Sequence, residues 1–159
     1  MTTMTTQQTG RRLPAALLVG GAFALTTLLN IAIHLGQILF TDQDPHAPQG
    51  PIDSIEIVAA VGGVGFLLAL ALAVPLSRDR RRAQVGAIVL GSLAIVSLAV
   101  FWSGAPASLG AAAAWLGGFA KGSYPQVGAA RGFAVVGLVI AVLEIVATIF
   151  GGAAGSFLG

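Results

Sequence analysis

The chain has 159 residues, of which 56% are hydrophobic and 9% are charged, with a formal net charge of +2 and no cysteine. Charged residues make up about a quarter of a soluble globular domain, so this composition indicates a membrane protein. Each bilayer crossing takes about 20 residues, which leaves no room for a soluble catalytic domain. The absence of cysteine excludes disulfides, thiolate nucleophiles and cysteine-bound zinc or iron–sulfur clusters.

The apolar run from residue 13 to residue 40 predicts the first membrane span. Residues 1–12 before it are small and polar, so we expect a disordered cytoplasmic N-terminus. A cleaved secretory signal is the alternative, because Arg11 and Arg12 followed by a short apolar region are typical of one. Apolar character continues unbroken to Phe40, which favours an uncleaved anchor.

Four further apolar runs follow a loop rich in proline and acidic residues. Residues 52–76 form the second run and stop at a basic cluster. Residues 83–102 form the third, which ends at a tryptophan typical of a membrane interface. Residues 106–120 are apolar but short, so they form a thin span, a re-entrant hairpin or an interfacial helix. Residues 132–150 are again long enough to cross.

The distribution of basic residues predicts the orientation, because Lys and Arg in short loops stay on the cytoplasmic side. If residues 106–120 cross, every basic side chain falls inside. These are Arg11, Arg12, Arg78, Arg80, Arg81, Arg82, Lys121 and Arg131. If that segment does not cross, Lys121 and Arg131 fall outside. The rule therefore favours five spans, with the N-terminus inside and the C-terminus outside, over four spans plus a re-entrant or interfacial helix.

We accordingly expect an all-α polytopic transmembrane helix bundle, with residues 13–159 forming a single membrane domain. The use of Arg in place of Lys and the abundance of Ala and Gly are typical of a high-GC bacterial genome, which favours the bacterial inner membrane. The basic clusters stand at the ends of apolar runs, so we expect them to set orientation and not to bind nucleic acid.

Small residues mark two candidate surfaces for close helix packing, where dispersion contacts hold helices together in lipid. Gly62 and Gly63 lie in the second run, and Gly110, Ala114 and Gly118 recur every four residues in the fourth. The recurrence favours a fourth helix that packs inside the bundle. A low-complexity stretch rich in Ala and Gly is the alternative.

Polar residues interrupt the first run at helical spacing. Asn30, His34 and Gln37 fall on one face of a helix, and a polar face is costly against lipid, so we expect it to point to the bundle interior, another subunit or water. From the rise of 1.5 Å per residue we expect Glu144 of the last run near the level of Asn30, and Glu56 of the second run near the level of His34.

Two interpretations of these polar residues remain open. Glu144 with Asn30 and His34 either binds a proton or a cation, or it donates one structural hydrogen bond as a neutral acid. His34 with Glu56 is either a pH-sensitive outward pair or an ordinary polar contact that closes the top of the bundle. An enzyme acting on lipids would have only that pair as its general base.

Searches for nucleotide-binding, hydrolase and zinc-protease motifs find none with the required spacing, so we expect no enzyme, cofactor or metal site. The sequence favours a non-enzymatic accessory or assembly subunit, which associates with other membrane subunits or with copies of itself in the lipid bilayer. The alternative is a small oligomeric transporter or channel for protons or cations that uses Glu144.

Overall fold

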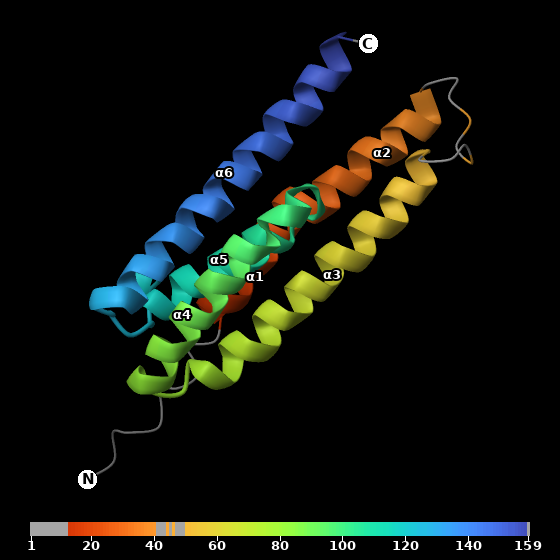
Figure 1. The fold of residues 1–159 in the computed structure, drawn as a ribbon. Coiled ribbons are helices and arrows are strands. Elements are labelled where there is room, and N and C mark those ends of the chain that lie inside the picture. The colour runs from red at the N-terminus through yellow and green to blue at the C-terminus, as the bar shows by residue number, and fades with distance from the viewer. Residues whose placement is uncertain (1–12, 41–43, 45, 47–49, 159) are drawn as a thin grey trace.

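The computed structural model describes residues 13–40, 44, 46 and 50–158, and these residues confirm the expected all-α class. The predicted disordered N-terminus, with Arg11 and Arg12, lies outside the described residues. Five helices make up the described part of the chain (Figure 1). The first helix joins α1 (Leu13–Phe23), the π-helical η2 (Ala24–Leu28) and α2 (Leu29–Phe40).

The remaining helices follow in chain order. They are α3 (Pro51–Leu76), α4 (Arg80–Val96) with the 3₁₀-helical η3 (Ser97–Ser103), α5 (Ala105–Ala114) with the π-helical η4 (Trp115–Phe119), and α6 (Gly128–Leu158). Four helices within the described residues are long and apolar enough to cross a membrane. They cover Leu17–Phe40, Pro51–Leu76, Arg80–Ser103 and Gly128–Gly151. The chain is a small multi-span membrane protein.

Local sequence explains where the helices begin. Pro51 occupies the first turn of α3, where its missing N–H costs nothing. Asp79 caps α4, because its carboxylate accepts a hydrogen bond from the backbone N–H of Arg82 at 2.8 Å. Gly104 precedes α5 with φ +82°, a left-handed conformation that glycine adopts without the steric cost of a Cβ.

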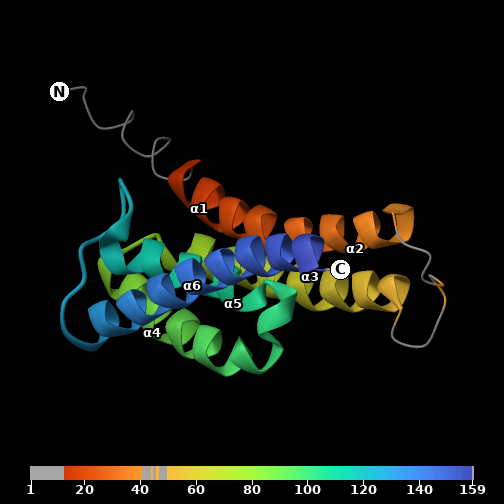
Figure 2. The same ribbon diagram turned by 90° about the horizontal axis from the view of Figure 1, so that it is seen from above.

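The short helix α5 occupies the interior of the bundle. All ten of its residues are buried, and it contacts α1, α3, α4 and α6. In Figure 2, α1 and α2 lie along one edge of the bundle and α4 with η3 along the opposite edge, with α5 and α6 between them. Close approach is possible because Gly110 of α5 faces the backbone carbonyl of Gly137 of α6, where a Cβ would collide.

Helices α4 and α5 form a hairpin whose tip is Ser103 and Gly104. The two helices run antiparallel, since Leu116 of η4, which follows α5, lies against Gly86 near the start of α4. The tip is level with the middle of the first helix, where the hydroxyl of Thr27 donates a hydrogen bond to the carbonyl of Ser103 at 2.8 Å. The hairpin therefore extends along only part of the length of the first helix (Figure 1).

The tip also carries Trp102. Its backbone carbonyl lies beside the middle of the first helix, because η3 bends at Val100 (φ −123°, ψ 38°) and Gly104 turns the chain back. That Trp102 marks a membrane interface stays a prediction. On α3 the tip is level with Gly62, eleven residues or about 16 Å from the first residue of that helix.

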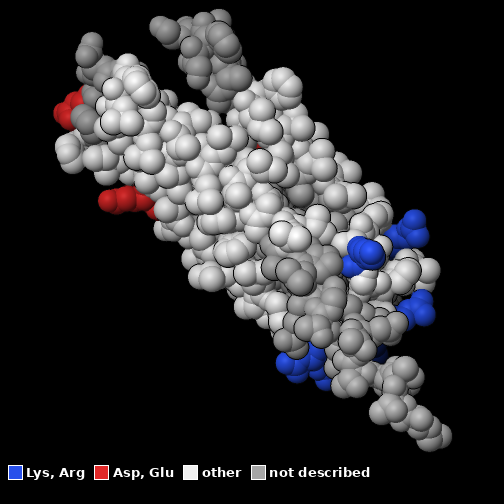
Figure 3. Space-filling view, turned by 180° about the vertical axis from the view of Figure 1, so that it is seen from behind, with Lys and Arg blue, Asp and Glu red and all other residues white. Residues whose placement is uncertain are grey.

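Charge separates the two ends of the bundle (Figure 3). The basic end carries the described basic residues, which are Arg78, Arg80, Arg81, Arg82, Lys121 and Arg131. The segment before α6 contacts the start of α4 there, since the side-chain amide of Gln126 donates to the backbone carbonyl of Arg80 at 3.4 Å. The opposite end, called the acidic end below, carries Asp44, Asp53 and Glu56.

Candidate intramembrane pocket

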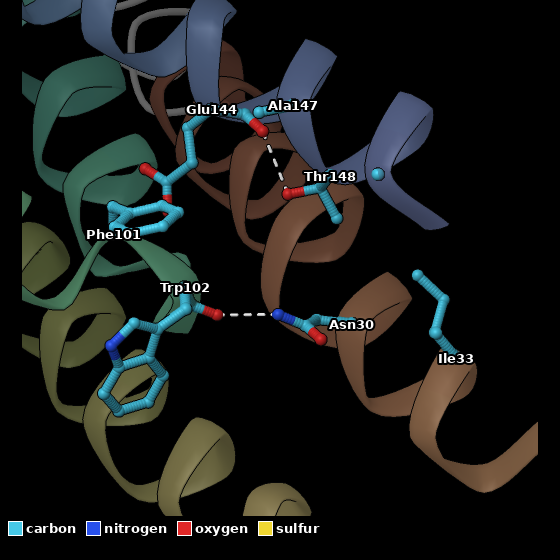
Figure 4. A pocket seen from close by; sticks show the side chains of 8 residues that line it. Asn30, Ile33, Phe101, Trp102, Glu144, Ala147 and Thr148 are labelled. Carbon is cyan, nitrogen blue, oxygen red and sulfur yellow. Dashed lines mark hydrogen bonds between the residues drawn. The ribbon is translucent and has the colours of Figure 1, made fainter. Parts of the chain in front are cut away.

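A cavity of about 260 Å³ lies beyond the tip of the hairpin, between α2, η3 and α6 (Figure 4). Its lining is mostly apolar and combines side chains from three helices that are distant in sequence. These are Asn30 and Ile33 of α2, Phe101 and Trp102 of η3, and Glu144, Ala147, Thr148 and Gly151 of α6. The structure therefore brings Asn30 and Glu144, predicted at similar depth, into one pocket.

Glu144 is the ionisable group of this pocket. Its residue is 7% exposed, and neither carboxyl oxygen has a hydrogen-bond partner among the described residues. The carboxyl group faces the backbone N–H groups of Ala107 and Gly104 at the N-terminus of α5. The first N–H groups of a helix have no partner within it and carry a partial positive charge, so this end of α5 offsets part of the cost of burying a negative charge on Glu144.

Asn30 and Thr148 flank Glu144, and each donates one hydrogen bond within the chain. The Asn30 amide Nδ2 donates to the carbonyl of Trp102 at 2.6 Å, and the Thr148 hydroxyl donates to the carbonyl of Glu144 at 2.9 Å (Figure 4). The bond of Asn30 to a carbonyl fixes which end of its amide is the NH₂ group. Its amide oxygen and the lone pairs of Thr148 remain as acceptors.

The polar side chains of the first helix make three different sets of contacts. Thr26 and Thr27, in η2, are buried and enclose Gly104 at the hairpin tip. Asn30 reaches both the tip and the pocket. His34 and Gln37, farther along α2, form a side-chain hydrogen bond with each other at 2.9 Å.

Glu56 lies apart from the pocket. It is exposed on α3, and no hydrogen bond or ion pair joins it to His34 in the part of the chain that the structure describes. The suggested His34–Glu56 pair is therefore not formed in this structure. His34 is also absent from the pocket lining, which leaves Glu144 with Asn30 as its polar neighbour from α2.

The predicted packing residues have different surroundings. Gly62 faces the hairpin tip and Gly110 faces α6, while Ala114 is buried in α5. Gly63 has open space where a Cβ would be, and Gly118 adopts φ +98° close to Pro125. Gly118 therefore ends the helical segment and does not continue the packing face of α5.

Several residues near the pocket were not found by sequence reasoning. Thr148 lies four residues after Glu144, and this spacing places two side chains on one helix face, so it was a usable signal. No sequence pattern predicts Phe101 as a pocket residue, because its position in the lining depends on where η3 turns. Ser108 Oγ of α5 and Trp115 Nε1 of η4 are buried without a hydrogen-bond partner among the described residues.

Comparisons of the chain with protein-family models, curated proteins and solved structures found no match. Over the residues described, no three His, Asp or Glu side chains gather as a metal site would require. The pocket around Glu144 is therefore the candidate site considered below.

Proposed function

We propose that this protein binds a cation in the pocket and carries it across the membrane, with Glu144 as the ion-binding group. The observation that supports the proposal is the buried carboxyl group of Glu144, a residue that lines the cavity, because neither carboxyl oxygen has a hydrogen-bond partner among the described residues. Ionisable residues within membrane spans are costly, and they commonly mark ion pathways.

The chemistry of the site favours exchange of a proton for a cation. An isolated carboxylate in hydrocarbon is expensive, so Glu144 is either protonated or paired with a positive charge. A cation that enters the pocket therefore displaces the proton, and its release allows the proton to return. This exchange couples transport of the cation to a proton gradient.

The packing of the bundle suggests how access to the pocket changes from one side of the membrane to the other. Between the pocket and the basic end the interior is filled by α5, while the acidic half beyond the hairpin tip lacks α4 and α5 (Figure 1). We propose that this conformation opens toward the acidic end. Movement of the hairpin between Gly104 and the turn at Gly118 would open the other side, because both glycines stand at breaks in the helices.

Proton release from proteoliposomes tests this function. The purified protein is reconstituted with a pH dye inside, and Na⁺, K⁺ or butylammonium chloride is added outside. We expect cation-dependent proton release for the wild type, and a reduction of about tenfold or more for Glu144→Gln, which removes the ionisable group and keeps the shape. Glu56→Gln is the matched control and should retain the flux, because Glu56 lies outside the pocket. Equal flux for Glu144→Gln and the wild type would refute the proposal.

A second candidate function is the non-enzymatic accessory or assembly subunit, in the bacterial inner membrane. Its support is that α2 buries none of its residues although it carries His34 and Gln37, and that Gly63 of α3 has open space beside it. A further helix could cover both features. If the chain self-associates in this way, Gly63→Leu should lower the oligomer mass measured by light scattering in detergent, while Leu67→Ala, a change at an exposed position on the same helix, should not.

A further inference from the structure

We infer that Glu144 of α6 caps the N-terminus of α5, so that the charge on its carboxyl group controls the position of the hairpin tip. The empty, ionised carboxylate keeps the tip in place, and a bound proton or cation releases it. The inference rests on the proposed function and names how binding at Glu144 is coupled to movement of the hairpin.

The first turn of α5 has no cap of its own. A capping side chain normally accepts a hydrogen bond from the second or third N–H group of a helix. Gly104 precedes α5 and has no side chain, and Pro106, the second residue, has no N–H group. The third N–H group, that of Ala107, faces the carboxyl group of Glu144, which extends from α6 toward the hairpin (Figure 4). Glu144 therefore supplies the acceptor group that a capping residue would otherwise provide.

Both oxygens of Glu144 are buried at this contact, and neither has a hydrogen-bond partner among the described residues. The contact is therefore an attraction between the carboxyl group and the partial positive charge at the helix N-terminus, and it is stronger for an ionised carboxylate than for a neutral acid. Because the oxygens are buried, a cation reaches them only when the carboxyl group and the first turn of α5 separate. The helix terminus and the cation therefore compete for the same carboxylate.

Two hydrogen bonds also fix the hairpin tip. The Thr27 hydroxyl donates to the carbonyl of Ser103 at 2.8 Å, and the Asn30 amide donates to the carbonyl of Trp102 at 2.6 Å. Both bonds join uncharged groups, so their strength does not depend on whether Glu144 carries a proton or a cation. The contact between Glu144 and α5 does depend on it, and binding at Glu144 can therefore shift the tip between two positions.

This dependence on charge is what the exchange of two ions requires. An empty carrier that changes sides lets one ion cross without the other, so the carrier should move only when it is occupied. The first turn of α5 attracts the empty carboxylate, whereas a bound proton or cation neutralises Glu144 and weakens the attraction. The hairpin is then free to move between Gly104 and the turn at Gly118.

Glu144 has no ionisable neighbour in the described lining of the pocket, which comes from α2, η3 and α6. Helix α5 carries no ionisable residue, the other charged residues of α4 and α6 lie at the basic end, and those of α3 lie at the acidic end. His34 of α2 lies outside the lining and shares a hydrogen bond with Gln37. A response of the tip to pH that persists in His34→Gln is therefore assigned to Glu144.

Hydrogen–deuterium exchange of the amides of residues 103–110 measures how often the tip opens. The wild type and Glu144→Gln are compared in lipid nanodiscs at matched pH, so that the chemical exchange rate is the same for both. At high pH we expect about tenfold faster exchange in Glu144→Gln, which removes the charge and keeps the shape. As the pH falls, the rate of the wild type should approach that of the variant. Glu56→Gln and His34→Gln should follow the wild type.

Two further measurements keep the test independent of one substitution. In the wild type alone, exchange of residues 103–110 relative to a segment of α3 should rise as the pH falls. At high pH, the cation among Na⁺, K⁺ and butylammonium that drives proton release should also speed this exchange. Glu144→Asp keeps the charge, and its exchange should still respond to pH if Glu144→Gln fails to fold.

The outcomes separate the inference from the function it rests on. Equal exchange in the wild type and Glu144→Gln at every pH would overturn the inference, and cation transport would stand if Glu144→Gln still lacks proton release. A constant excess in Glu144→Gln at every pH would show a packing role that does not depend on charge, which also overturns the inference. If exchange follows pH through Glu144 but proteoliposomes show no flux, the cap is supported and the proposed function fails.

Discussion

The side-chain amide of Asn30 donates a hydrogen bond of 2.6 Å to the backbone carbonyl of Trp102, and this bond joins α2 to the tip of the α4–α5 hairpin. One residue thereby holds the turn in place and lines the pocket that contains Glu144. A change in the position of the hairpin would therefore also change the shape of the pocket.

Asn30→Leu should destabilise the protein by about 1 kcal/mol, because interhelical hydrogen bonds in membrane proteins contribute about that much. The carbonyl of Trp102 would lose its side-chain donor in an apolar setting. Unfolding in mixed micelles with increasing dodecyl sulfate measures the change. Ile33→Ala, at another pocket position, removes no hydrogen bond and serves as the control for altered lining. Unfolding of Asn30→Leu at the wild-type concentration would show that the bond does not hold the tip.

Gly104→Ala should destabilise the hairpin strongly, by about 2 kcal/mol or more. Its φ of +82° costs an alanine about 1–2 kcal/mol, and the added Cβ would also collide with the hydroxyls of Thr26 and Thr27. Gly132→Ala in α6 is the matched control, since open space surrounds that position. Thermal aggregation in detergent compares the two, and similar midpoints would contradict the tip geometry.

The neighbouring glycines Gly62 and Gly63 should respond in opposite ways to alanine. A Cβ at Gly62 would meet the carbonyl of Ser103 and the side chain of Thr27, whereas one at Gly63 meets open space. We expect Gly62→Ala to lower the unfolding midpoint. Gly63→Ala should leave it unchanged or raise it, because alanine is the better helix former by about 1 kcal/mol. The reverse order would place the hairpin tip on the wrong face of α3.

The separation of charge predicts which loops share a side of the membrane. Arg78→Cys lies at the basic end, and Val127→Cys lies beside Gln126, which contacts Arg80 at the same end. Asp44→Cys lies in the loop at the acidic end. The native chain has no cysteine, so each variant carries a single thiol. In intact cells an impermeant maleimide should label Asp44→Cys, and it should label the other two only after the membrane is opened. Labelling of Val127→Cys from outside without labelling of Arg78→Cys would contradict the position of both residues at one end of the bundle.

Helix positions could be predicted from sequence because hydropathy and loop composition vary sharply along this chain. The first run, residues 13–40, matches the helix from Leu13 to Phe40, and the second, residues 52–76, matches α3 to within one residue. Small residues recurring in the fourth run favoured an interior helix, and α5 is buried along its whole length. Hydropathy gives no depth, however, so the level of the hairpin tip could not be predicted.

The candidate site was predictable only in part, for a related reason. Asn30 and Glu144 could be found because polar residues stand out in apolar helices and helical rise gives their approximate height. Phe101 and Trp102 enter the pocket because Gly104 takes a left-handed conformation in the middle of the bundle. That turn depends on tertiary contacts with Thr26 and Thr27, which the local sequence does not show.

The complete burial of α5 has a consequence for the order of assembly. A helix whose surface contacts lipid is stable in the bilayer before its neighbours are inserted. The surface of α5 is instead covered in part by α6, which is synthesised after it. Residues 105–119 therefore reach their final environment only when the last helix has entered the membrane. Truncation before α6 would leave the Gly110 face of the hairpin uncovered. We expect quality-control proteases to degrade such a chain.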